Sequence, residues 1–136
     1  MLRSGYLDDF KSGPKVLLWG DREAMQKLAA LLRAASIGHG PLGLDSFSEA
    51  VDGRSIVIEP TSRSYGMISQ DGWFRWGLDP ETSSQFAEMI DVLAEVKEPG
   101  HQYLECGVLD EIVVMVARDE YPADLNPKVR LDAASA

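Results

Sequence analysis

Hydrophobic residues recur along the chain at two spacings, one typical of helices and the other typical of strands. Between residues 22 and 37 apolar side chains return every three or four positions, which predicts a helix with one buried face. Gly20 or Asp21 can cap the start of this helix, and Gly38 and Pro41 cannot continue it. The first helix is therefore expected to end near Ile37.

A second helix is predicted from residue 80 to about residue 96. Asp79 can cap it, Pro80 suits its first turn, and an apolar stripe follows at helical spacing until Pro99. Both helices should bury one face and expose the other.

Short β-prone runs fill much of the remaining chain. Strands are predicted at residues 15–19, 55–59, 101–106 and 111–118. The last run is so apolar that it is expected to lie inside a sheet rather than at its edge. Residues 42–44 are expected to form a short edge strand, and residues 45–51 to form one or two helical turns.

A turn signal at Asp71-Gly72 separates two further β-prone runs, residues 65–69 and 73–78. Asp-Gly favours the two-residue turn that matches the twist of paired strands, so these runs are predicted to form a hairpin. With Asp71 and Gly72 as the turn, Ser69 should face Phe74 and Met67 should face Trp76. One side of the hairpin should face the core, with Met67, Phe74, Trp76 and Leu78. The other side should carry Ile68, Trp73 and Arg75.

These elements predict an α+β fold. The economical arrangement is a two-layer sandwich, with both helices packed on one face of a mostly antiparallel sheet of five or six strands. Residues 1–122 are expected to form a single domain, and residues 123–136 a surface-laid or frayed tail. No internal repeat is apparent in the sequence.

The charge balance limits the partners that the protein is expected to have. The chain has 13 Lys and Arg against 22 Asp and Glu, which gives a net charge of -9. A surface of this sign repels phosphate backbones and anionic lipid headgroups, so neither nucleic acid nor a membrane is an expected partner. A basic protein surface would instead be attracted.

The cysteine content and the N-terminus both favour a cytoplasmic protein. Cys106 is the only cysteine, so no disulfide can form within the chain, which fits a reducing compartment. Residues 1–10 lack the continuous apolar run of a secretory signal.

The sequence carries no recognised catalytic motif. Residues 38–43 spell G-x-G-x-x-G, but these glycines follow a helix instead of opening one, so they are interpreted as a helix stop and a turn. No cofactor and no metal site are expected. The remaining alternative is a small enzyme or ligand-binding domain with a pocket near His101, Glu105 and Cys106, which supply acid, base and thiol groups. His101 and Cys106 lie five residues apart and would point to opposite faces of a regular strand.

The most informative feature is the polar side of the second helix. It carries five acidic residues and only Lys97 to offset them: Glu81, Glu88, Asp91, Glu95 and Glu98. Like charges three or four residues apart destabilise a helix by about 0.2–0.5 kcal/mol per pair. The simpler interpretation is a solvated face. The functional interpretation is that Glu88, Asp91, Glu95 and Glu98 form a docking strip for a basic partner.

The outer side of the predicted hairpin is a second candidate surface. Trp73 and Arg75 are residue types that are enriched at the energetic centres of interfaces. The same side could equally be covered by the N-terminal segment or by a second copy of the chain, which would make the protein a homodimeric structural subunit.

Three runs are similar to those of small uncharacterised bacterial proteins, some of which resemble toxin-immunity proteins. The runs are Trp76-Gly-Leu-Asp-Pro-Glu81, Gly100-His-Gln-Tyr-Leu-Glu105 and Val113-Val-Met-Val-Ala-Arg-Asp-Glu-Tyr-Pro122. The resemblance covers residues 65–122 and implies a cytoplasmic domain that binds and blocks a partner. The sequence therefore favours a non-catalytic protein-binding domain, such as an immunity-type inhibitor of a basic protein.

Overall fold

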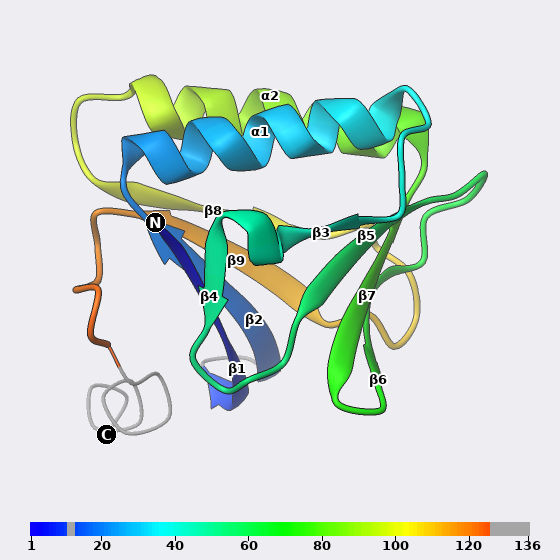
Figure 1. The fold of residues 1–136 in the computed structure, drawn as a ribbon, viewed down its shortest axis with the longest axis horizontal. Coiled ribbons are helices and arrows are strands. Elements are labelled where there is room, and N and C mark those ends of the chain that lie inside the picture. The colour runs from blue at the N-terminus through cyan, green and yellow to red at the C-terminus, as the bar shows by residue number, and fades with distance from the viewer. Residues whose placement is uncertain (11–12, 126–136) are drawn as a thin grey trace.

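The computed structural model of this protein describes residues 1–10 and 13–125. Within these residues the fold is α+β, with two helices packed side by side above the strands (Figure 1). The elements are β1 (Leu2–Phe10), β2 (Gly13–Gly20), α1 (Arg22–Ser36), β3 (Leu42–Gly43), the short 3-10 helix η1 (Leu44–Ser46), β4 (Ser48–Ala50), β5 (Ile56–Pro60), β6 (Gly66–Gln70), β7 (Trp73–Leu78), α2 (Pro80–Glu95), β8 (Gly100–Leu104) and β9 (Val113–Arg118).

The strands form two mixed sheets. The first has five strands in the order β4-β1-β2-β9-β8, and the second has four in the order β3-β5-β7-β6. Three pairs are parallel (β1 with β4, β2 with β9, β5 with β7), and the others are antiparallel. The prediction of one mostly antiparallel sheet of five or six strands is therefore wrong. The hydrophobic pattern shows which face of a strand is buried, but it does not show which distant strand lies beside it.

The local elements agree better with their predictions. The hairpin of β6 and β7 has the predicted register, with Ser69 opposite Phe74 and Met67 opposite Trp76. Asp21 and Asp79 are the N-caps of the two helices, and β9 lies inside its sheet between β2 and β8.

Two segments differ from their predictions. β1 was not predicted, because Arg3, Asp8 and Asp9 interrupt its apolar residues. Residues 45–51 contain the end of η1 but continue into β4, which pairs with β1 through only three residues.

The main hydrophobic core lies beneath the two helices and contains side chains from both sheets. Its largest fully buried side chains include Met25 and Leu28 from α1, Leu18 from β2, and Phe74 and Trp76 from β7. The amphipathic stripes that predicted the helices are therefore the faces that cover this core.

A smaller apolar cluster lies on the other face of the five-stranded sheet. Leu17 and Trp19 of β2 pack there with Met115 of β9, and Leu125 covers them with 3% of its own surface exposed. The Trp19 indole nitrogen donates a hydrogen bond to the carbonyl oxygen of Pro122 at 3.1 Å. The part of the expected tail that the structure describes, residues 123–125, thus ends against this sheet, and residues 126–136 lie outside the described residues.

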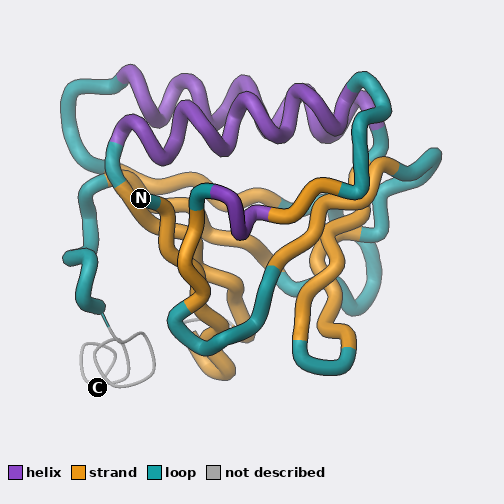
Figure 2. The backbone as a smooth tube through the Cα atoms, viewed as in Figure 1, coloured by secondary structure: helices purple, strands orange, loops and turns teal. Residues whose placement is uncertain are grey.

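The two halves of the chain repeat one arrangement: a hairpin, a helix, and two antiparallel strands, the second of which pairs in parallel with the hairpin of the other half. The first half also contains η1 and β4. Figure 2 shows the two helices side by side on the same side of the strands. Val16 of β2 lies opposite Val114 of β9, and Phe74 of β7 lies opposite Ile56 of β5, both in parallel pairs. Phe74 follows Val16 by 58 positions, and Val114 follows Ile56 by 58 positions.

The same spacing of 58 relates other features of the halves. The N-cap carboxylate of Asp21 accepts a hydrogen bond from the Ala24 N–H at 2.9 Å, and that of Asp79 accepts one from the Thr82 N–H at 2.8 Å. Four pairs of buried helix positions also match: Leu28 with Phe86, Ala29 with Ala87, Leu32 with Ile90, and Ala35 with Leu93. The fold is therefore an internal repeat in which β3 and β5 of the first half join the sheet of β6 and β7, and β8 and β9 of the second half join the sheet of β1 and β2.

Candidate functional site

The first helical turn of α2 is fixed by two polar side chains. The Asp79 carboxylate caps the helix and also accepts a hydrogen bond from the Ser64 hydroxyl at 3.0 Å. The Ser64 hydroxyl in turn accepts one from the Asp79 backbone N–H at 2.8 Å. These bonds, led by the one from Thr82, lower the pKa of Asp79 and keep the cap charged at neutral pH.

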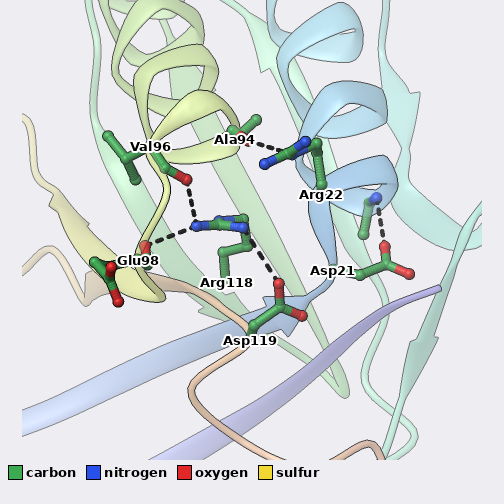
Figure 3. Close-up of polar contacts among 8 residues, drawn as sticks. Asp21, Arg22, Ala94, Val96, Glu98, Arg118 and Asp119 are labelled. Carbon is green, nitrogen blue, oxygen red and sulfur yellow. Dashed lines mark hydrogen bonds and ion pairs between the residues drawn. The ribbon is translucent and has the colours of Figure 1, made fainter.

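Two arginines fix the other end of α2 (Figure 3). Arg22 donates from Nε to the Ala94 carbonyl at 2.8 Å. Arg118 donates from Nη2 to the carbonyls of Val96 and Glu98, both at 2.7 Å. Cations beside the last carbonyls of a helix complement the partial negative charge of its C-terminus.

These arginines bind backbone carbonyls and leave the neighbouring carboxylates free. Glu88, Glu95 and Glu98 are exposed, and within residues 1–10 and 13–125 none of their carboxylates makes an ion pair or hydrogen bond. Asp91 differs, because it is half-buried and forms an ion pair with Arg33 of α1. This contact raises the pKa of Arg33 and removes Asp91 from the free acidic surface. We define the acidic strip as Glu88, Glu95 and Glu98.

Arg75 and Trp73 lie on the outer face of the four-stranded sheet, where the sequence placed them. Arg75 is held by Glu59, with Nε to Oε1 at 2.8 Å and Nη2 to Oε2 at 3.1 Å, and this bond lowers the pKa of Glu59. The Tyr65 hydroxyl also donates to Glu59, at 3.0 Å. Trp73 is half-buried. The charge of Arg75 is thus already paired, which weakens its case as a contact for a partner.

The alternative pocket is not assembled. The ring Nδ1 of His101 lies 2.9 Å from Glu120, and Glu105 is exposed. Cys106 lies instead near Ser64 and Glu111, in the connection after β8. In the described part of the chain, no hydrogen bond or ion pair joins any two of His101, Glu105 and Cys106.

The thiol of Cys106 is poorly suited to nucleophilic chemistry. Burial, followed by the charge of Glu111, raises its pKa to about 11. A thiol must ionise to act as a nucleophile or metal ligand, and this one remains protonated at neutral pH. The raised pKa therefore argues against a thiolate nucleophile at Cys106.

Arg22 and Arg118 were not predicted from the sequence to fix the acidic helix. Arg118 is 4% exposed and ends the apolar strand β9, while Arg22 opens α1. The sequence did contain one signal, because Arg118 stands at the end of an apolar run, and a buried cation there requires several hydrogen-bond acceptors. The target of that cation depends on the arrangement of both halves.

The sequence matches no protein-family model and no curated protein. None of the helices in the described residues is long and apolar enough to cross a membrane.

Proposed function

We propose that this protein is a non-catalytic protein-binding domain that docks a basic partner through the acidic strip on α2. The main support is that Glu88, Glu95 and Glu98 are exposed and unpaired among the described residues, while both ends of their helix are fixed. A rigid array of like charges attracts a surface of opposite charge and increases the rate of association. An immunity-type inhibitor that covers a basic active site, as the resemblance implies, would use such a surface.

The test is affinity capture from the source cell with the full chain, over a series of salt concentrations. The variant carries Glu88→Lys, Glu95→Lys and Glu98→Lys. A matched control carries Asp8→Lys, Asp71→Lys and Asp124→Lys, which changes the net charge equally at exposed positions on other segments. We expect the wild type and the control to retain a partner at low salt and the strip variant to lose it, because screening weakens exposed charge contacts.

A partner held equally by the wild type and the strip variant would refute this interface. Loss of the partner from both triple variants would show that net charge matters and the strip does not.

A further inference from the structure

The free edges of the two sheets differ in how far they are protected. A strand at the edge of a sheet directs every second N–H and C=O group away from its neighbour, where another chain can pair with it. The edges are β4 and β8 in the first sheet, and β3 and β6 in the second. β3 and β4 have only two and three residues, and β6 is bridged by Ile112, whose N–H donates to the Met67 carbonyl at 2.8 Å. Three of the four edges therefore offer little room for a further strand.

The edge of β8 has none of these protections. It consists of five residues, Gly-His-Gln-Tyr-Leu, and contains neither proline nor lysine. Within residues 1–10 and 13–125, its backbone groups make no hydrogen bond to any segment other than β9. An open edge of this kind suits the addition of a strand from another protein, in which main-chain hydrogen bonds supply affinity.

The internal repeat shows that the fold does not impose this open edge. Pro41 and Pro99 are 58 positions apart and precede the counterpart strands β3 and β8. β3 ends after two residues, and the chain turns into η1, where Leu44 is 1% exposed. β8 instead continues for five residues. A strand of this length at the sheet edge is therefore a property of the second half alone.

Charge identifies the kind of strand that fits this edge. Glu98 of the acidic strip lies two residues before β8, and Glu105 follows its last residue; both are exposed. Lys97 is the only Lys or Arg in residues 95–112. A second copy paired along β8 would bring these carboxylates close to its own, in a chain of net charge -9. A basic strand would instead find an acid near each end of β8.

We propose that β8 accepts an extended segment of a basic protein partner as an additional strand, with Lys or Arg side chains of this segment near Glu98 and Glu105. The inference rests on the proposed function, because this partner is the basic protein that the acidic strip binds. α2 packs beside β8, and Glu98 belongs to both surfaces, so the added strand continues the contact from the end of α2 along the sheet.

The test is amide hydrogen exchange on the purified complex between the full chain and the protein that it captures. Alternate amides in residues 100–104 should exchange about tenfold or more slowly in the complex, because an added strand bonds only the N–H groups that face outward. The amides of β3 and β4 are the internal control and should keep their rates. Equal rates for β8 in the free and bound chain would overturn strand addition, even if the strip variant still loses the partner.

Two proline substitutions provide a second measurement. Adjacent residues of a strand direct their N–H groups to opposite sides, so of His101→Pro and Gln102→Pro one removes an N–H that faces β9 and the other an N–H that faces the open edge. The variant with the lower unfolding midpoint is the one that disturbs β9. The other should keep a midpoint closer to the wild type and bind the purified partner about tenfold more weakly. Wild-type affinity of this stable variant would contradict the proposal.

A single charge change tests the far end of the strand. Glu105→Gln should weaken binding about two- to fivefold at low salt and less at high salt, because salt screens exposed charges. Asp71→Asn is the matched control, since Asp71 is exposed at the hairpin turn. A dimer of the chain alone with the same β8 amides protected would overturn the proposal, because the occupant of the edge would be a second copy. If the wild-type chain captures no partner, the proposed function and strand addition both fail.

Discussion

At the scale of single residues, the arginines at the end of α2 decide which charges on this helix are available. Arg118 is almost fully buried, yet its guanidinium bonds two backbone carbonyls and lies 3.3 Å from the Asp119 carboxylate. Burying a charge is tolerated only when it is paired and hydrogen-bonded. Because these acceptors lie on the backbone, the strand β9 holds the chain after α2 without neutralising Glu95 or Glu98.

Removing this guanidinium should destabilise the fold. We expect Arg118→Ala to lower the free energy of unfolding by about 3 kcal/mol, because two carbonyls lose a charged donor. Arg63→Ala is the control, since the Arg63 side chain is exposed, and it should change stability by less than about 0.5 kcal/mol. Chemical denaturation of both variants measures the difference. Equal midpoints would show that the Arg118 contacts contribute nothing to stability.

At the scale of elements, helix starts were the features best predicted from sequence. Asp79 and Pro80 define the beginning of α2 through short-range chemistry, and the hairpin register followed from the turn at Asp71-Gly72 in the same way. β1 was not predicted, because it is a strand through its pairing with β2 and β4 and not through the hydrophobic pattern of its own residues. The same distinction holds for the candidate site. Helical spacing in the sequence predicts the acidic side of α2, but the Arg33–Asp91 ion pair depends on how the two helices pack.

The cap of α2 should make stability depend on pH in a defined direction. The pKa of Asp79 is lower in the folded protein than its ordinary value, so its charged form stabilises the fold above about pH 4. This contribution is lost as the pH falls and the carboxylate takes up a proton.

Two substitutions at Asp79 separate the cap from its charge. Asp79→Ala should cost about 1–2 kcal/mol at pH 7, and Asp79→Asn should cost less because Asn still caps a helix. The gap between the wild type and Asp79→Asn should narrow as the pH falls from 7 to 3, because the lowered pKa of Asp79 means that the folded protein binds this proton less readily than the unfolded chain. Denaturation at both pH values provides the check. A gap that stays constant would mean that the Asp79 charge does not stabilise the helix.

At the scale of the whole molecule, the internal repeat explains why the strands form two mixed sheets, whereas the hydrophobic pattern of the sequence predicted a single sheet. The chain leaves β2 through α1 and enters the second sheet at β3, and it leaves β7 through α2 and enters the first sheet at β8. Few residues are identical at the spacing of 58, so the repeat is visible in the strand pairing and not in the sequence. The hydrophobic positions match between halves, whereas the side chains that occupy them differ in size, as with Leu28 and Phe86.

The repeat also predicts that the order of the halves can be exchanged. Thr61 donates its N–H to the Leu78 carbonyl at 3.0 Å, and Asp119, 58 positions later, donates to the Gly20 carbonyl at 2.9 Å. After Thr61 the chain continues directly into β6. After Asp119 it reaches Ala123, which lines a hollow of about 180 Å³ together with Met1, the residue before β1. Met1 and Ala123 therefore line one hollow, close to the point where the chain leaves β9.

A circular permutant in which Ala136 is joined to Met1 and the chain is opened between Ser62 and Arg63 tests this relation. Both residues at the opening are exposed, and every paired strand is retained. We expect cooperative unfolding with a free energy within about 2 kcal/mol of the wild type, because the cost of closing a flexible loop changes slowly with its length. An insoluble or non-cooperatively unfolding permutant would show that folding requires the native order of the halves. Retained partner binding by a stable permutant would further show that the acidic strip acts independently of that order.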